Sequence, residues 1–349
     1  MKLYNLGKVS WQDSQLIYHA LAELGWESLV LLSPETPYVC IGYHQDVNLD
    51  VDLDYCKANN IPVFRREVGG GAVYLDGDQL FFQLILPQGS PIAPPSIQAF
   101  YRKFLQPIIN VYREIGIEVK YKPVNDLVVE NRKICGSGAG EIGESIAFVG
   151  NMIIDFDYRM MSRVLRIPDE KFRDKVKKTI EENLSTIRRE LGADQSARWD
   201  ESTLNRMMAD EFSRIIGPLE PSTISTELEI KVRDVAAKML NDSWLHKIRR
   251  NTDGQTVKVR SGLEMIHRLN KTVGGLIRAE FAVHEGRYKD VSLSGDFFSF
   301  PKAVVDLLAA ELEGRETKEL PILIKNFFSD NTLDQPGISP DDWLGILKI

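Results

Sequence analysis

The chain has 349 residues, of which 43% are hydrophobic and 27% are charged. This composition excludes a disordered or fibrous chain and, at roughly 150 residues per domain, predicts two folded domains. Forty-three basic residues against fifty acidic ones give a formal net charge of −7, so we expect no binding to nucleic acid or to an anionic membrane surface. No apolar run approaches the roughly 18 residues that span a bilayer, and the amino terminus lacks a secretory signal pattern. We therefore expect a cytoplasmic protein.

The cysteines and histidines give no pattern of a metal site. Cys40, Cys56 and Cys135 are too few and too widely spaced for a disulfide framework or a CxxC motif. The five histidines show no metal-ligand spacing either. Backbone groups, lysine, arginine and carboxylates are therefore the expected carriers of any chemistry.

The first third of the chain predicts a helix followed by a sheet. Residues 10–24 begin with a Ser cap and place apolar side chains at helical spacing. Short β-rich runs separated by Gly, Pro and Asp turns follow at residues 29–32, 38–42, 62–66, 72–75 and 79–86. We expect these runs to form one sheet. A proline-rich loop then leads to a helix from Ser96 to about Ile115, which Pro107 should kink.

The remaining chain alternates between β-rich and helical patterns. Further strands are predicted at residues 119–122, 126–129, 133–134 and 147–156, and four helical segments within residues 158–245. A second α/β stretch has strands at 276–283 and 289–293 and helices at 302–312 and 320–328. The charged run at residues 249–255 is the best candidate for a linker. We therefore predict two domains, residues 1–249 and residues 250–349.

A glycine-rich segment is the first candidate for a binding site. Residues 65–76 read RREVGGGAVYLD, with three successive glycines between two predicted strands. Without Cβ atoms, Gly69, Gly70 and Gly71 would let backbone N–H groups approach a phosphate or carboxylate, and the guanidinium of Arg66 would add charge and donors. This pattern predicts an anion-binding loop. Taken alone, the segment could equally be a glycine-rich hairpin with solvent-facing arginines.

A second polar segment follows about sixty residues later. Residues 125–137 read NDLVVENRKICGS: a polar pair, a short strand, a turn, and then Lys133 in another strand. A lysine on a strand can be held against an anion, where its compact charge suits a carboxylate and a phosphate together. Taken alone, such a lysine is more often solvent-exposed.

Together, the two segments resemble the lipoate–protein ligase branch of the biotin and lipoate ligase family. The hallmarks of that branch are RRxxGGGAV and ND(L/I)…RK(I/V)xGS, and both stand in this chain. Residues 148–157 are similar to the family's following strand, and residues 275–298 to its small carboxy-terminal domain. The resemblance covers nearly the whole chain. It implies an α/β (α+β) fold, in which a biotin/lipoate ligase-like large domain with mixed sheets flanked by helices carries a small α/β accessory domain.

The resemblance also implies a two-step reaction. Lipoate and MgATP would give lipoyl-AMP, and a lysine of an acceptor protein, carrying a lipoyl domain or resembling H protein, would then displace AMP. The implied catalytic residue is Lys133, between the acyl carbonyl and the α-phosphate, and Asp126 is the implied contact for Mg²⁺. The substrate- or ATP-binding residues would be Arg66, Gly69, Gly70, Gly71, Ala72, Val73, Asn125, Asp126, Gly136 and Ser137. Candidates for an apolar slot are Ile41, Val73 and Phe148. We expect a monomer.

The accessory domain shows no nucleophile or phosphate loop, so we expect it to contain no chemistry of its own. By resemblance, it would close over the large domain during adenylation. The chain departs from the family pattern at Tyr43, Val68, Leu75 and Val149, which leaves the substrate range and the identity of the acceptor open.

Three alternatives remain beside the ligase. An octanoyltransferase would form a thioester, with Cys135 as its nucleophile, because alternation in a strand would point Lys133 and Cys135 the same way. A lipoate-binding relic would have no activity. A biotin ligase is disfavoured because the GRGRxGR loop is absent. The basic run at residues 171–178 could meet an acidic lipoyl domain, although a solvated helix face is the expected role.

Overall fold

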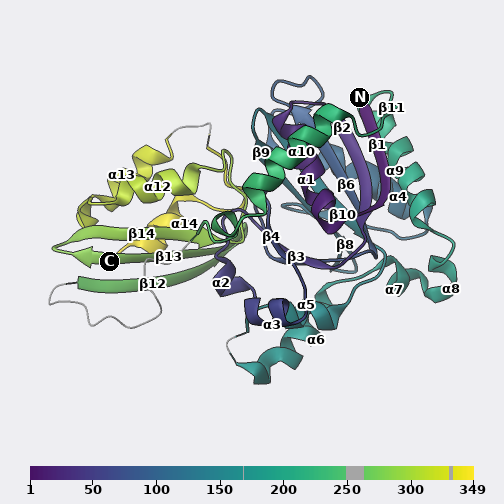
Figure 1. The fold of residues 1–349 in the computed structure, drawn as a ribbon. Coiled ribbons are helices and arrows are strands. Elements are labelled where there is room, and N and C mark those ends of the chain that lie inside the picture. The colour runs from purple at the N-terminus through teal and green to yellow at the C-terminus, as the bar shows by residue number, and fades with distance from the viewer. Residues whose placement is uncertain (168, 249–262, 330–332) are drawn as a thin grey trace.

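The computed structural model describes residues 1–167, 169–248, 263–329 and 333–349. Figure 1 shows a large body, formed by the chain up to residue 248, and a smaller body that begins at residue 263. The predicted boundary and linker near residue 250 lie outside the described residues, so the division into residues 1–249 and 250–349 stays a prediction. Within the described ranges, no helix is both long and apolar enough to cross a membrane.

The large body is built on a mixed sheet of eight strands. In sheet order these are β11 (Glu220–Pro221), β1 (Lys2–Val9), β2 (Ser28–Pro34), β6 (Gln79–Pro87), β10 (Ser145–Ile153), β9 (Arg132–Ile142), β8 (Asp126–Val129) and β7 (Lys120–Lys122). Strand β1 runs parallel to β2 and β11, and all other neighbours are antiparallel. The mixed sheet agrees with the expected fold, although β1 was not predicted.

Helices cover both faces of this sheet. Helix α1 (Trp11–Glu23) packs with α10 (Thr226–Met239) on one face, and α4 (Ile97–Glu114) packs with α9 (Glu201–Ile216) on the other (Figure 1). The side chains of β2 alternate between the two cores: Leu29 and Leu31 pack toward α4 and α9, whereas Val30 and Leu32 pack toward α1. Ser10 accepts a hydrogen bond from the Asp13 N–H at 3.1 Å, as the sequence predicts for a helix cap.

A second, three-stranded sheet packs against α1 from the other side. It contains β4 (Val63–Arg65), β3 (Tyr38–Ile41) and β5 (Val73–Leu75) in that order. The prediction of a single sheet is therefore wrong, because β2 and β6 pair with each other whereas β3 pairs with β4 and β5. Local strand patterns do not specify the partner strand. The glycine loop, residues 66–72, connects β4 to β5 and lies over the space between the two sheets.

The helical part of the large body is more divided than predicted. Between residues 158 and 248 the described chain forms seven α-helices rather than four, because polar caps such as Thr186, Asp200 and Ser225 start new ones. Besides α9 and α10 these are α5 (Tyr158–Val164), α6 (Arg173–Asn183), α7 (Ile187–Leu191), α8 (Ala193–Ser196) and α11 (Asp242–Leu245), with a 3-10 turn η1 at Glu170–Phe172. Two short helices, α2 (Val47–Asp50) and α3 (Leu53–Ala58), precede β4.

The smaller body has its own sheet and core. Strands β12 (Leu263–Thr272), β13 (Gly275–His284) and β14 (Arg287–Gly295) form an antiparallel meander. Helices α12 (Val304–Leu312), α13 (Leu320–Phe327) and α14 (Pro340–Leu347), with a 3-10 turn η2 at Thr317–Glu319, cover one face around the buried Trp343. Strands β13 and β14 and helices α12 and α13 match the predicted positions, whereas β12 and α14 were not predicted.

Candidate active site

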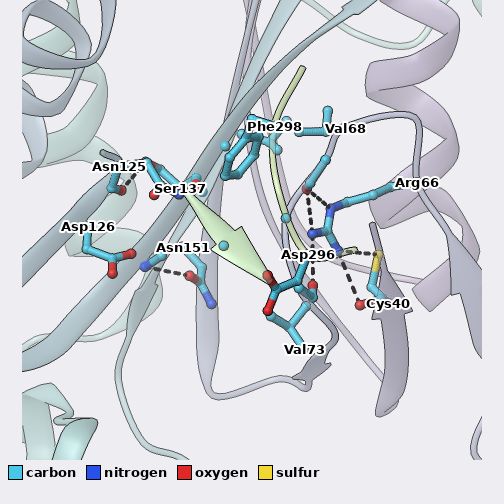
Figure 2. Close-up of a pocket in the computed structure, with 18 of the residues that line it drawn as sticks. Cys40, Arg66, Val68, Val73, Asn125, Asp126, Ser137, Asn151, Asp296 and Phe298 are labelled. Atoms are coloured by element: carbon cyan, nitrogen blue, oxygen red, sulfur yellow. Dashed lines mark hydrogen bonds between the residues drawn. The ribbon is translucent and has the colours of Figure 1, made fainter. Parts of the chain in front are cut away.

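A cavity of about 430 Å³ lies where the two sheets of the large body meet the smaller body (Figure 2). Most of the predicted site residues line it: Arg66, Gly69, Gly70, Gly71, Val73, Asn125, Asp126, Lys133, Gly136 and Ser137. Ala72 does not line the cavity but packs against the buried cluster behind β3. Residues that are far apart in the sequence therefore share one cavity, although their roles stay predictions.

Lys133 and Asp126 form an ion pair in this cavity. The Lys133 ammonium lies 2.6 Å from the Asp126 carboxylate, and both side chains are partly exposed. The pair forms because β8 and β9 are neighbouring antiparallel strands that bring residues 126 and 133 together. A Cβ atom on Gly136 would lie 3.1 Å from Cε of Lys133, so the glycine leaves room for the lysine to lie across the strand. The carboxylate thus fixes the direction of the one lysine that β9 aims into the cavity.

Asn125 and Asn151 hold the strands around this ion pair. Asn125 donates to the Ser137 carbonyl, and the Ser137 hydroxyl donates back to the Asn125 carbonyl at 2.6 Å. Asn151 accepts from the Gly136 N–H at 3.3 Å and donates to Gln79 at 2.5 Å. Figure 2 shows Asn125, Asp126, Ser137 and Asn151 together on one side of the cavity. This side is polar, and hydrogen bonds connect its side chains to the neighbouring strands.

The glycine loop is folded around the side chain of Arg66, and its predicted role in binding an anion stays a prediction. The Arg66 guanidinium donates to the carbonyls of Cys40, Gly69 and Gly71 and to the Cys40 sulfur, so its donors fold the loop (Figure 2). The Gly70 N–H donates to the Phe297 carbonyl at 2.9 Å. A Cβ atom on Gly69 would lie 2.4 Å from that same carbonyl oxygen. The glycines therefore permit close contact with the smaller body, and the side-chain donors of Arg66 are bonded within the chain.

Two charged residues at the start of the loop, Arg65 and Glu67, are buried. Arg65 is 0% exposed and donates to backbone carbonyls, among them those of Tyr43 and Leu245, so it joins α11 to the loop that follows β3. Burial would raise the pKa of Glu67, but His19 and the ammonium groups of Lys302 and Lys238 lower it to about 2. The Lys302 ion pair connects the loop to the smaller body.

The apolar wall of the cavity uses other residues than predicted. Val73 lines it, but Ile41 and Phe148 are fully buried in separate clusters, so assigning them to the apolar slot was wrong. Both belong to strands whose alternate faces point away from the cavity. Besides Val73, the wall is formed by Tyr18, Cys40, Val68, Leu75, Phe81, Val149 and Phe298. Three of these, Val68, Leu75 and Val149, are positions at which the chain departs from the family pattern, and each adds apolar surface.

The fourth departure, Tyr43, lies outside the cavity lining. Its ring packs under the Lys247 ammonium at 3.6 Å from the ring centroid. Tyr43 therefore has a packing role between α11 and the loop that follows β3.

Cys135 does not face the cavity, contrary to the alternation argument. Leu127 pairs with Cys135 and Val128 with Lys133, so Ile134 is an extra residue that breaks the alternation of β9. Cys135 is 0% exposed in the main core, and burial raises the pKa of its thiol. Cys40 is the cysteine that lines the cavity, but it is 1% exposed and burial raises its pKa, with Arg66 opposing the shift. Both thiols are therefore protonated at neutral pH.

The smaller body supplies lining residues that the sequence analysis missed: Lys271, Val273, Gly274, Gly275, Asp296 and Phe298. Phe298 reaches into the core cluster around α1. The run NKTVGG at residues 270–275 is a sequence signal for the first four of them, since it places a lysine at a glycine turn.

Comparison with known proteins identifies the family. The model of the lipoyl protein ligase A/B catalytic domain matches residues 9–213. The chain belongs to this family. Octanoyltransferase LipM of Kyrpidia tusciae is 25% identical over 67% of the chain and 92% of its own length. Lipoate–protein ligase 1 of Staphylococcus aureus is 24% identical over 78% of the chain and 76% of its own length.

The fold of this family member also matches a solved structure along nearly its whole length. LipL1 of P. falciparum, solved in complex with lipoate, superposes with a TM-score of 0.68 at 16% identity and covers 93% of this chain and 94% of its own. The expected fold, a large body with a flanked mixed sheet and a small carboxy-terminal sheet body, is confirmed.

Proposed function

We propose that this family member is an ATP-dependent lipoate–protein ligase. It would activate lipoate as lipoyl-AMP and transfer the lipoyl group to a lysine of an acceptor that carries a lipoyl domain. The Lys133–Asp126 ion pair, at the polar side of a cavity with an apolar wall, is the observation that carries the proposal. Lipoate has a carboxylate and an aliphatic tail, so its binding site needs a charged surface and an apolar surface in one cavity.

The chemistry of adenylation requires a positive group at the reacting atoms. The carboxylate of lipoate must approach the α-phosphorus of ATP, and both carry negative charge. An ammonium held by Asp126 in a partly desolvated cavity offsets this repulsion and positions the two reactants. The Asn125 and Ser137 bonds keep β8 and β9 at the distance that the ion pair requires.

Among the described residues, Asp126 and Asp296 are the two carboxylates that line the cavity. Mg²⁺ is usually held by one or two carboxylates together with substrate phosphates, so these two residues suit an ion that arrives with ATP. Across the part of the chain that the structure describes, no group of three or more His, Cys, Asp or Glu side chains could hold a metal. Asp126 remains the proposed magnesium contact.

Acyl transfer without ATP is the second candidate, because Cys40 lines the cavity and LipM is among the relatives. A covalent mechanism would need the Cys40 thiolate. Burial raises the pKa of this thiol, which favours the ligase.

Incubation with a purified apo-lipoyl domain distinguishes the two candidates. With lipoate and MgATP, the ligase predicts that the acceptor gains one lipoyl group and that AMP forms in equal amount. With an octanoyl thioester and no ATP, it predicts an unmodified acceptor. Acceptor octanoylation without ATP, together with an acyl group trapped on Cys40, would replace the proposal by the transferase.

A further inference from the structure

Three cationic side chains line the cavity in the described residues: Arg66, Lys133 and Lys271. The Arg66 donors are bonded to the glycine loop and to Cys40, and Lys133 is paired with Asp126 at 2.6 Å. Lys271 lies 4.0 Å from Asp296 and its side chain is 70% exposed. Of the three, Lys271 is therefore the cation most able to bond to an incoming anion.

The turn that follows Lys271 is bonded both within itself and to a neighbouring loop. It joins β12 to β13, and the Thr272 hydroxyl donates to the Gly275 carbonyl at 2.8 Å. The Gly274 N–H donates to the Gly337 carbonyl at 2.8 Å, and a Cβ atom on Gly274 would lie 2.2 Å from the Pro336 carbonyl oxygen. The loop at residues 336–337 thus fixes the turn, and the turn presents Lys271 to the cavity.

Asp296 places this lysine beside the glycine loop. The Cβ atom of Asp296 lies 3.7 Å from the position of a Cβ atom on Gly71, and Asp296 accepts from the Leu276 N–H. Lys271 is the partner of this carboxylate. An anion that binds at the glycine loop would therefore meet the Lys271 ammonium from the side of the smaller body.

We propose that Lys271 binds the β- and γ-phosphates of ATP and stabilises the departing pyrophosphate. The inference rests on the proposed function and deepens it. In that reaction a carboxylate oxygen of lipoate forms a bond to the α-phosphorus, the bond from this phosphorus to the bridging oxygen breaks, and negative charge develops on pyrophosphate. An ammonium beside that charge lowers the barrier of this step.

The positions of Lys133 and Lys271 assign the two lysines to different parts of the reaction. Lys133 lies with Asp126 on the strands of the large body, whereas Lys271 lies with Asp296 on the smaller body. Transfer of the acyl group from lipoyl-AMP releases AMP and involves no β- or γ-phosphate. Lys271 therefore acts in adenylation and not in transfer, and it gives the smaller body a chemical role that the sequence analysis did not expect.

The test compares Lys271→Gln with Lys289→Gln in the full chain. Lys289 lies on β14 of the same body, 4.0 Å from Glu313 and 48% exposed, so it is a matched lysine away from the cavity. Lipoate-dependent ATP–pyrophosphate exchange by Lys271→Gln should fall at least about tenfold in kcat/KM for ATP, with a similar weakening of inorganic pyrophosphate binding. Lys271→Arg should restore most of the exchange. Acyl transfer from preformed lipoyl-AMP should stay within twofold.

Four results would overturn the inference. These are exchange by Lys271→Gln within twofold of the wild type, an equal loss in Lys289→Gln, unchanged pyrophosphate affinity, or an equal loss of transfer from preformed lipoyl-AMP. A wild-type chain that transfers lipoyl groups but shows no exchange would overturn the proposed function and this inference together. A wild-type chain with exchange and an unaffected Lys271→Gln variant would overturn this inference alone.

Discussion

The ring of Phe298 is the main apolar contact that the smaller body makes with the cavity wall. It is 8% exposed and belongs to the core cluster between α1 and the sheet of β4, β3 and β5. A Cβ atom on Gly138 would lie 2.8 Å from Cε1 of this ring, and one on Gly70 would lie 2.9 Å from its Cζ. Phe298→Ala should therefore leave a void between the glycine loop, β9 and the smaller body.

The size of the effect follows from the burial. An aromatic side chain buries about 150 Å² or more, which at about 25 cal/mol per Å² is about 4 kcal/mol. Measured losses for buried Phe→Ala substitutions, about 3–5 kcal/mol, agree with this value. Urea denaturation, followed by tryptophan fluorescence, should show a free energy of unfolding lower by that amount.

Phe172→Ala is the control, because Phe172 is 48% exposed on η1. A surface substitution of this kind should change the free energy of unfolding by less than about 0.5 kcal/mol. The packing argument would be refuted if Phe298→Ala lost less than about 1 kcal/mol, or if the two variants lost the same amount.

Three further predictions address the site and its surroundings. Lys133→Ala should reduce lipoate-dependent ATP–pyrophosphate exchange at least about a hundredfold without unfolding the chain. Lys120 is an exposed lysine on β7, and Lys120→Ala should leave the exchange unchanged. Similar exchange in both variants would exclude the role assigned to Lys133 in adenylation. Cys135→Ser should keep ATP-dependent lipoylation in the acceptor assay, and an acyl thioester trapped on Cys135 would contradict this. Burial lowers the pKa of His19 from 6.5 to about 4, so the unfolded chain binds a proton at this residue more readily than the folded chain does. The contribution of the neutral His19 to the free energy of unfolding is therefore complete above pH 6.5 and is lost as the pH falls toward 4. In thermal melts, His19→Gln should remove roughly 3 kcal/mol of this acid sensitivity, and identical profiles would refute the assignment.

The sequence predicts elements well where local pattern decides them. Helix α1 begins at its predicted cap, and strands β6, β13 and β14 lie at the predicted positions, because capping and alternation are local properties. Strand β1 escaped prediction because, of its eight residues, only Tyr4 is fully buried. Strand β9 is longer than predicted, since Gly138 and Gly140 read as breaks in the sequence. In the fold they make room for Phe298 and Val68.

The candidate site was predictable only in part, because several of its contacts join residues that are far apart in the sequence. Lys133 and Asp126 were both named from the family resemblance, but the ion pair between them, which two strands joined by a short turn bring together, was not predicted. The inward-turned donors of Arg66 depend on the path of the glycine loop and on the Phe297 carbonyl, more than 200 residues away in sequence. Lys271 could not be placed before the contact between the two bodies was known.

The most direct test of the central claim is ATP–pyrophosphate exchange by the wild-type chain, with and without lipoate. A ligase that forms lipoyl-AMP predicts incorporation of labelled pyrophosphate into ATP that requires lipoate and Mg²⁺ and needs no acceptor protein. Exchange that is absent, in a preparation that still acylates a lipoyl domain from a thioester donor, would contradict the account.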